Sequence, residues 1–416
     1  MTNSIETWRN AAPRIARRIL RRPSRLLRRE VLPRVMPPAQ AFRGRPAAHA
    51  HVVGLLSSAT GIGKSARLCV QVLHRAGYPV STKNVAALFA SEDGIAAPLP
   101  ARSFTPAGFC IYHLNPSMLL PGLIWSGLAR YYRSCNIAYW AWELETLPPE
   151  WITSFRYMHA IMVPSQFCAA AIRRHTTKPV IVVPHPVEDP RIAPLPRSAG
   201  PLHVVHVFRF GSSFERKNPI ALVTAFRAAF GSDRDVKLSL KTSDGGRFPA
   251  EMVRLRKAIG GQENIALIDE VWPEDRVAAL MRSADVYASL HRSEGFGLPL
   301  AEAIMAGVPV IATNWSGNTD FCTPDHSFPV DCALVPFRDD HGDYEQVRNA
   351  RWAEPSIEHA ASQLRRVRDD LPAARAKARA AKAALRRYIE ANSYQAALAS
   401  LADHAAGEAR LATLPS

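Results

Sequence analysis

The sequence has 416 residues, of which 47% are hydrophobic and 21% charged, and its formal net charge is +16. The length suggests two domains of ordinary size, and the hydrophobic fraction is enough for buried cores. No apolar run reaches the roughly 18 residues of a membrane-spanning helix, and the arginine-rich start lacks the apolar block of a secretory signal. We therefore expect a cytoplasmic protein.

The first 46 residues form a basic N-terminal segment. Residues 1–45 carry twelve arginines against two glutamates, and so hold ten of the sixteen net positive charges. Apolar residues recur there partly at helical spacing, which suits an anionic membrane surface, the inner face of the cytoplasmic membrane. A solvated tail remains the alternative, since five prolines interrupt the segment. We expect no nucleic-acid partner, because no aromatic ladder accompanies the charge.

The cysteines predict no metal site and no disulfide framework. None of the six lies in a CxxC pair, and no histidine cluster has zinc-ligand spacing. Reduced thiols in a cytoplasmic protein fit this pattern.

After Pro46, apolar runs alternate with amphipathic helices. We predict strands at 51–56, 79–80, 109–112, 137–140, 160–163 and 179–183, and a helix at 64–76. Continuous apolar strands between helices indicate a parallel sheet covered on both faces. Ser165 is expected to cap a helix.

The loop between the first strand and the first helix reads SSATGIGKS, residues 57–65, and ends like a phosphate-binding P-loop. The full motif needs glycine where Ser58 stands. A P-loop-like phosphotransferase therefore stays open as an alternative, with Lys64 as its phosphate contact. Otherwise Gly61 and Gly63 let the backbone approach a cleft between two domains. Lys64 then meets a phosphate of the donor or of a lipid carrier, or is only solvated.

Six prolines between residues 184 and 201 indicate a domain boundary. A second series follows, with strands at 203–208, 236–241, 265–268, 285–289 and 308–312, and helices at 219–230, 249–259, 273–283 and 299–306. We expect a Rossmann-like domain at 47–200, a second at 201–385, and a helical tail at 386–416 that can return to the first domain. Ligands of such folds bind at the carboxyl ends of the strands.

The most informative stretch is HRSEGFGLPLAEAIMAGVPVIATNWSGNTD, residues 291–320. Glycines follow a strand, and Pro299 is placed in the first turn of a helix, where proline is tolerated. The start of that helix favours a diphosphate. Glu294 on the loop can accept hydrogen bonds from sugar hydroxyls, and Glu302, one turn into the helix, from ribose hydroxyls.

On this string the chain resembles the retaining family-4 glycosyltransferases, whose hallmark is two glutamates separated by seven residues. Three further strings carry the resemblance, which spans about residues 50–400: FRFGSSFERKNPIALVTAFRAAF (208–230), NIAYWAWELETLPPEW (136–151) and VPSQFCAAAIRR (163–174). The resemblance implies an α/β fold of GT-B architecture, with two Rossmann-like domains facing each other across a cleft. It implies that a sugar moves from a nucleotide-diphosphate sugar to a glycan acceptor, and we expect that acceptor to be lipid-linked and part of surface polysaccharide synthesis.

The resemblance also implies roles for particular residues. Lys217 and either Arg209 or Arg216 grip the donor diphosphate, together with the turn made by Gly295, Phe296, Gly297 and Leu298. Glu294 contacts the donor sugar and Glu302 the ribose. His113 lies near the sugar and phosphate. On the acceptor side, aromatic rings such as Trp140 can stack on sugars, and Glu143 can orient a hydroxyl.

The implied reaction proceeds on one face of the sugar, with the leaving phosphate helping to deprotonate the acceptor, so no carboxylate nucleophile is expected. We expect no metal and no cofactor, because a helix terminus and cationic side chains can stabilise the departing diphosphate; the adjacent pairs Asp339-Asp340 and Asp369-Asp370 lack Asp-x-Asp spacing. A non-catalytic sugar-nucleotide-binding subunit is a further alternative, and a sugar-nucleotide epimerase lacks specific support. The donor sugar, its base, the acceptor and the oligomeric state stay open.

Overall fold

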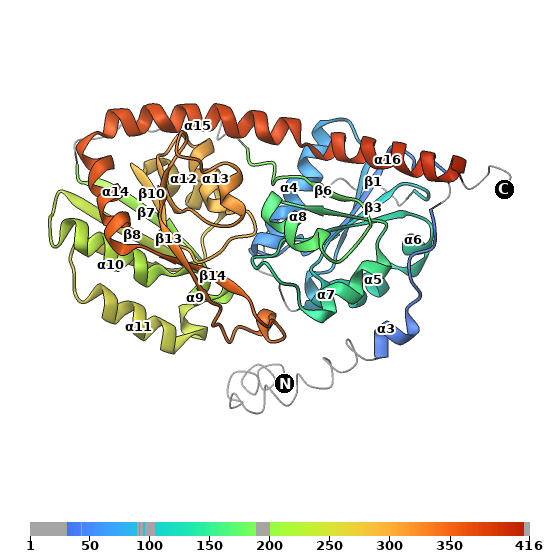
Figure 1. The fold of residues 1–416 in the computed structure, drawn as a ribbon, viewed down its shortest axis with the longest axis horizontal. Helices are drawn as coiled ribbons and strands as arrows, with labels where there is room; N and C mark the ends of the chain where they lie inside the picture. The colour runs from blue at the N-terminus through green and yellow to red at the C-terminus, as the bar shows by residue number, and fades with distance from the viewer. Residues whose placement is uncertain are drawn as a thin grey trace, which may run out of the picture.

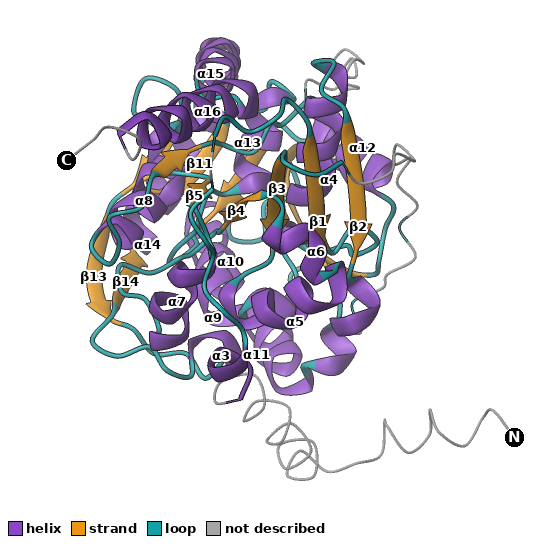
Figure 2. Cartoon of the chain, turned by 90° about the vertical axis from the view of Figure 1, so that its right-hand side faces the viewer, coloured by secondary structure: helices purple, strands orange, loops and turns teal. Residues whose placement is uncertain are grey.

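The structure is a computed structural model that describes residues 31–42, 44–89, 91, 95, 105–188 and 200–411, the last with side chains to residue 406. Two domains lie side by side, and each has a sheet covered by helices (Figures 1 and 2). Most of the basic N-terminal segment, residues 1–30, falls outside the described residues, and so does the membrane-facing helix expected there. Part of the proline-rich boundary, residues 189–199, lies outside them as well.

The first sheet has six parallel strands in the order β2-β1-β3-β4-β5-β6. Its strands are β1 (Ala50–Gly54), β2 (Val80–Asn84), β3 (Phe109–His113), β4 (Cys135–Tyr139), β5 (Ala160–Val163) and β6 (Val180–Val182). The accompanying helices are α3 (Leu32–Val35), α4 (Gly61–Arg75), α5 (Pro116–Ser126), α6 (Leu128–Tyr132), α7 (Pro149–Ser154) and α8 (Gln166–Arg173). Strands β1, β3, β4 and β5 are buried along their whole length, as expected for a parallel sheet between two helical layers.

The second sheet also has six parallel strands, in the order β12-β11-β10-β7-β8-β9. Its strands are β7 (Leu202–Val207), β8 (Val236–Thr242), β9 (Ile265–Asp269), β10 (Val286–Ser289), β11 (Val310–Thr313) and β12 (Phe328–Val330). The helices of this domain are α9 (Phe214–Lys217), α10 (Pro219–Phe230), α11 (Pro249–Ile259), α12 (Glu274–Ser283), α13 (Leu298–Met305), α14 (Ile357–Asp369) and α15 (Leu371–Ala391).

These two sheets confirm the predicted α/β class with two Rossmann-like units. Helix starts follow from local chemistry: the Thr60 hydroxyl accepts from the Gly63 N–H at 3.2 Å, and the Ser165 hydroxyl accepts from the Cys168 N–H at 3.2 Å. Pro299 sits in the first turn of α13, as predicted. Sequence analysis did not predict the short strand β12 or the antiparallel pair β13 (Cys332–Pro336) and β14 (Arg351–Pro355).

The C-terminal helices join the two domains. Helix α15 packs on α13 of the second domain and runs along the top of Figure 1 toward the first domain, where α16 (Tyr394–Leu411) continues over α4. Tyr394, Leu398 and Leu401 of α16 are buried in the hydrophobic cluster of the first sheet. The last helix of the chain therefore covers the first domain, although the chain reaches it from the second.

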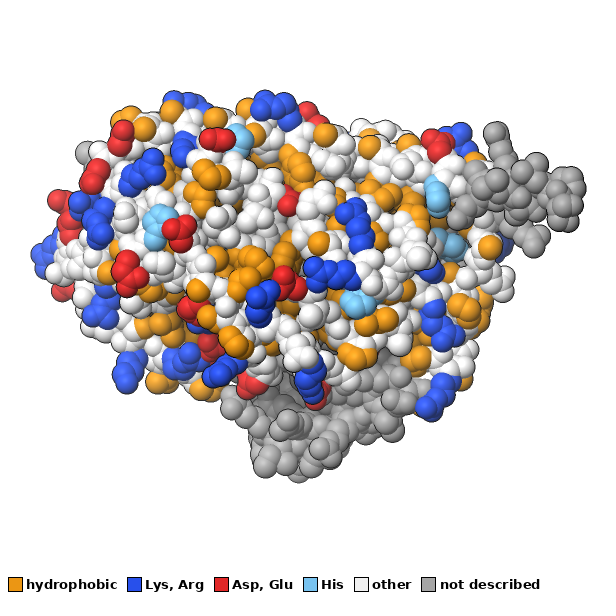
Figure 3. Space-filling model, in the orientation of Figure 1, with side chains coloured by type: hydrophobic (Ala, Val, Ile, Leu, Met, Phe, Trp, Pro, Cys, Tyr) orange, Lys and Arg blue, Asp and Glu red, His pale blue; other side chains and the backbone are white. Residues whose placement is uncertain are grey.

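The described surface is mixed in character. Figure 3 shows hydrophobic, basic and acidic side chains interspersed over the described part of one face. Within the described residues, none of the helices is both long enough and apolar enough to cross a membrane.

Candidate active site

A cavity of about 1260 Å³ lies between the two domains. Its lining residues follow the carboxyl ends of strands in both sheets, among them β3, β4, β7 and β10. This is the position at which ligands of open α/β sheets bind. Most of the expected site residues line it: Gly61, Lys64, His113, Glu143, Arg209, Arg216, Lys217, Glu294, Gly295, Phe296, Gly297, Leu298 and Glu302.

Glu294 is the centre of a buried charge cluster. Lys217 Nζ lies 2.5 Å from Glu294 Oε1, and Arg216 Nη1 lies 3.0 Å from Oε2. Burial alone would raise the pKa of Glu294, but these two cations outweigh it and hold the pKa at about 2. Burial lowers the pKa of Lys217, against the opposing charge of Glu294. Glu294 is therefore a firmly ionised carboxylate and not an acid at neutral pH.

The loop that carries Glu294 is fixed from both sides. The Glu294 N–H donates to Ser316 Oγ at 2.8 Å, and the Gly317 N–H donates to the Glu294 carbonyl at 2.9 Å. From the first domain, Ser165 Oγ donates to the Gly295 carbonyl at 2.6 Å. A Cβ at Gly317 would lie 2.2 Å from that carbonyl oxygen, so only glycine fits there. The loop geometry thus depends on contacts from two domains.

Helix α13 begins at the cavity wall without a side-chain cap. Gly297, its N-cap residue, has φ +89°, a left-handed conformation that favours glycine. Gly295, Phe296, Gly297, Leu298 and Pro299 all line the cavity. Pro299 has no N–H, and the Leu300 and Ala301 N–H groups both donate to the Gly297 carbonyl, at 2.9 and 3.1 Å. This end of α13 can therefore favour an anion in the cavity through the helix dipole and the Leu298 N–H.

Glu302 lies further along α13 and forms an ion pair across the cleft with Lys64 of α4. Burial opposes the charge on Lys64, but Glu302 outweighs it and raises the Lys64 pKa. The P-loop-like lysine therefore bonds a protein carboxylate. Gly61 lines the cavity, whereas Gly63 does not. A Cβ at Gly63 would lie 2.5 Å from the Ser58 carbonyl oxygen, so the missing side chain of Gly63 permits tight packing of the turn. The expected role of Gly63 in the cleft is therefore wrong.

A second interdomain ion pair was missed by sequence analysis. Arg67 of α4 lies 2.5 Å from Glu274 at the start of α12, and its other guanidinium nitrogen donates to the Leu56 and Ser58 carbonyls at 3.1 and 2.6 Å. Arg67 is 4% exposed. Arg67 stands on the buried side of an amphipathic helix, and nothing in that pattern indicates a partner 207 residues further along the sequence.

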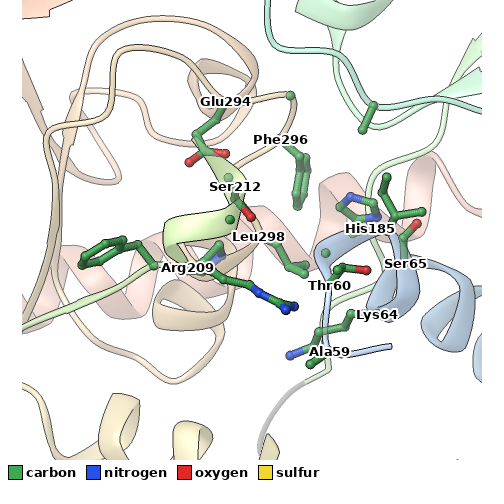
Figure 4. A pocket seen from close by; sticks show the side chains of 18 of the residues that line it. Ala59, Thr60, Lys64, Ser65, His185, Arg209, Ser212, Glu294, Phe296 and Leu298 are labelled. Carbon is green, nitrogen blue, oxygen red and sulfur yellow. The ribbon is translucent and has the colours of Figure 1, made fainter. Parts of the chain in front are cut away.

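The two candidate arginines occupy different places. The guanidinium of Arg216 contacts Glu294, and it donates to the Ser293 carbonyl at 3.0 Å and the Ser212 carbonyl at 2.9 Å. Arg209 pairs with Asp244 at 2.5 Å and, in Figure 4, extends toward Ala59 and Lys64 of the first domain. Arg216 thus holds the Glu294 loop, while Arg209 belongs to the cavity wall.

Two buried histidines line the cavity. His113 stacks on Tyr139 with ring centroids 4.6 Å apart, and its Nδ1 is 2.9 Å from Ser65 Oγ. Its Nε2 is buried and has no hydrogen-bond partner among the described residues. His185, which sequence analysis missed, lies edge-on to Phe296 across the cleft at 5.0 Å (Figure 4). Burial lowers the pKa of each histidine to about 3, so both are neutral near pH 7. The available signal for His185 was a polar residue three positions after the end of β6.

The aromatic residues after β4 divide between core and cavity. Trp140 is fully buried, packs against Trp151 and donates its N–H to the Leu114 carbonyl at 2.9 Å. It does not line the cavity, so the expected sugar-stacking role of Trp140 is corrected to a core role. Glu143 does line the cavity and lies 3.7 Å from Arg216. Burial raises the pKa of Glu143.

Metal-binding geometry is not evident in the described part of the chain. No group of three or more His, Cys, Asp or Glu side chains there could hold an ion. Asp233-Arg234-Asp235 has the Asp-x-Asp spacing of metal-dependent transferases, but it lies between α10 and β8, and neither aspartate lines the cavity.

Solved structures with the same fold include Anabaena HepE in complex with UDP and glucose, which matches with a TM-score of 0.56 and 13% identity over 88% of this chain and all of that one. Staphylococcus aureus TarM matches with a TM-score of 0.52 and 13% identity, over 71% of this chain. Burkholderia multivorans α,α-trehalose-6-phosphate synthase matches with a TM-score of 0.52 and 12% identity, over 75% of this chain and 74% of that one. The present chain spans 55% of the TarM chain's length. At these identities the likeness concerns the fold, which is the GT-B fold.

A search of curated protein sequences found no match to this chain. A sequence model of the family described as "Family 4 Glycosyltransferase in conflict systems" matches residues 165–400. This range covers more than half of the chain and includes Lys217, Glu294 and Glu302. The chain therefore belongs to the family-4 glycosyltransferases of conflict systems, built on a GT-B fold.

Proposed function

We propose that this protein is a retaining glycosyltransferase that moves a sugar, most simply a hexose, from a nucleotide-diphosphate sugar to a hydroxyl of a glycan acceptor. The observation that carries the proposal is the cluster of Glu294, Lys217 and Arg216 beside the open start of α13, with Glu143 facing it from the other domain. Cationic side chains and the positive end of the α13 dipole line one cavity, and a leaving diphosphate is stabilised by both.

Donor binding follows from this arrangement. The diphosphate lies at the start of α13, within reach of Lys217 and Arg209, and the ribose hydroxyls donate to Glu302. Negative charge grows on the diphosphate as the glycosidic bond breaks, so these donors act most strongly in the transition state. Glu294 accepts hydrogen bonds from the donor sugar. His113, neutral at pH 7, offers its buried Nε2 to the sugar or phosphate.

The reaction in this proposal needs no carboxylate nucleophile. Glu294 is held by two cations, which stabilises its charge and lowers its nucleophilicity. The acceptor hydroxyl instead attacks from the face of the leaving diphosphate, whose oxygen takes the proton, and the anomeric configuration is retained. Charge stabilisation by Lys217, Arg209 and α13 makes the proposed reaction metal-independent, so excess EDTA should leave transfer unchanged.

We further propose a lipid-linked acceptor in surface polysaccharide synthesis, with residues 1–45 holding the enzyme at an anionic membrane surface on the cytoplasmic side. Twelve arginines in that segment support this location. Residues 37–39 pack against the first domain, where the Pro37 carbonyl accepts from Tyr131 Oη at 3.1 Å. Removal of residues 1–30 should therefore release the protein from anionic vesicles and leave donor binding intact. Unchanged vesicle binding would contradict the location.

The donor can be identified by a thermal-shift panel of UDP-, GDP- and ADP-sugars, because a bound ligand raises the unfolding temperature by mass action. UDP-sugars come first, since the HepE and TarM structures contain UDP. With the stabilising donor, Lys217→Ala and Glu302→Ala should each lower transfer more than tenfold. Lys257→Ala, an exposed lysine on α11 outside the cavity, is the matched control. Wild-type rates in both cavity variants would refute the site.

A further inference from the structure

The antiparallel pair β13–β14 and its connecting loop, residues 332–355, form an arm that belongs to the second domain by sequence and packs on the first. Tyr344, Val347, Ala350 and Trp352 of this arm are buried in the same hydrophobic cluster as Trp140 and Trp151 of the first domain. In Figure 1 the arm (orange) leaves the second domain and its loop reaches toward α7. The arm thus closes one end of the cleft.

The tip of the arm is held at both domains. Tyr344 Oη donates to Glu143 Oε2 at 3.4 Å, and the Tyr344 ring meets Trp142 edge-on at 5.5 Å. On the side of the second domain, Ser213 donates to Asp339, and His341 Nε2 lies 3.1 Å from the Gly211 carbonyl. These contacts fix the tip at a defined position beside Glu143.

We use the name arm subsite for this end of the cavity, lined by Glu143, Glu150 and Trp151 of the first domain and by Asp343, Tyr344 and Gln346 of the arm. Three of these six side chains are carboxylates, one is an amide and two are aromatic. The basic side chains beside them are engaged: Arg216 contacts Glu294, and His341 Nδ1 lies 3.7 Å from Asp343.

We propose that the arm subsite binds an uncharged, hydroxyl-rich sugar unit of the acceptor and rejects a phosphorylated or carboxylated one. The inference rests on the proposed function and narrows its acceptor. Carboxylates and an amide accept and donate the hydrogen bonds that sugar hydroxyls offer, whereas an anion would face three carboxylates.

The subsite also meets the reaction centre. Glu143 and Glu294 both contact the guanidinium of Arg216, at 3.7 and 3.0 Å. A sugar held by Glu143 therefore places a hydroxyl beside the donor sugar that Glu294 contacts. Any phosphate of a lipid carrier would have to lie beyond this sugar unit, outside the arm subsite.

The test uses the full chain and neutral nitrophenyl glycosides of glucose, galactose and mannose, each paired with its 6-phosphate. Ligand-observed NMR measures the binding of each member of a pair. We expect the wild type to prefer the neutral glycosides. Glu143→Gln should lower the neutral-to-phosphate ratio about tenfold and Asp343→Asn, whose side chain is more exposed, about threefold. Asp340→Asn removes the same charge from an exposed arm residue outside the cavity and should leave the ratio unchanged.

Preference of the wild type for the phosphates, absence of glycoside binding, or equal ratios in all three variants would overturn the inference. Thermal shifts with the nucleotide-sugar panel are measured on the same samples. If no nucleotide-sugar stabilises the wild type, the proposed function fails, whereas the glycoside ratios still decide whether the arm subsite exists.

Discussion

Replacement of Glu294 by glutamine should destabilise the fold through the cations it leaves behind. The side chain keeps its shape, but Lys217 and Arg216 lose the carboxylate that lies 2.5 and 3.0 Å from them. A pKa held at about 2 instead of the ordinary 4.5 corresponds to a charge interaction of about 3 kcal/mol at neutral pH. The loss of one partner of a buried ion pair typically costs about 3–5 kcal/mol, which agrees.

Urea unfolding at pH 7 should therefore show Glu294→Gln with a free energy of unfolding lower by about 3 kcal/mol. Because the pKa of Glu294 is depressed in the folded state, its contribution is complete above pH 4.5 and is lost as the pH falls toward 2. The gap between wild type and variant should shrink over that range. Lys217→Met in the Glu294→Gln background should recover part of the loss, since it removes one uncompensated buried cation.

The matched control is Glu263→Gln, which breaks an exposed pair with Arg234. It should change the free energy of unfolding by no more than about 0.5 kcal/mol. Equal stability of Glu294→Gln and wild type at pH 7, or a gap that does not narrow below pH 4.5, would refute the account of the buried cluster.

Three further predictions concern other parts of the cleft. Lys64→Met and Glu302→Gln should each lower the thermal unfolding temperature, and the unfolding temperature of the double variant should be no lower than that of the less stable single variant. This corresponds to a coupling free energy of about 1 kcal/mol between the two side chains, whereas additive losses would mean that the ion pair contributes nothing. Between pH 6.5 and 5 the unfolded chain protonates His113 while the folded protein does not, so this histidine should lower the free energy of unfolding by about 2 kcal/mol over that range. His113→Phe should remove this pH-dependent loss. An unchanged dependence of the free energy of unfolding on pH, measured by urea titration, would contradict the prediction. Gly297→Ala should lower the free energy of unfolding by at least about 1 kcal/mol, because Gly297 has a positive φ. Gly246→Ala should not, because the space around Gly246 is open, and calorimetry of both variants tests the difference.

The sequence was enough to predict most strands of the two sheets and the residues that gather around Glu294 in the cavity, because both depend on local patterns. Buried parallel strands read as continuous apolar runs, and glycine, proline and glutamate at fixed offsets mark the strand-to-helix turn at residues 294–302. The predicted helices 219–230 and 249–259 have the same bounds as α10 and α11 in the structure. These features need no knowledge of the other domain.

The remainder depends on contacts between distant segments. The arm at 332–355 has partly exposed strands, and its buried side chains face the first domain. Its sequence therefore shows neither an alternating strand pattern nor a continuous apolar run from which the arm could be predicted. Trp140 and Trp142 are two residues apart, yet Trp140 is confined to the core while Trp142 also lines the cavity. Lys64 resembled a phosphate ligand because it stands near the end of a P-loop-like string. Its carboxylate partner, Glu302, lies in the other domain, so the local sequence does not reveal the ion pair.

The return of the last helix limits how the two halves of the molecule can move. The polypeptide passes between the halves twice, once between β6 and β7 and again between α15 and α16, where Asn392 and Ser393 separate the helices. Two domains joined by the polypeptide at one point can rotate about three axes relative to each other. Two domains joined at two separate points rotate mainly about one axis, the line that passes through both points. We therefore expect relative motion of the two domains to be mainly a rotation about one axis. Residues 392 and 393 mark one end of the expected axis, and they lie far along the sequence from most of the residues that line the cavity.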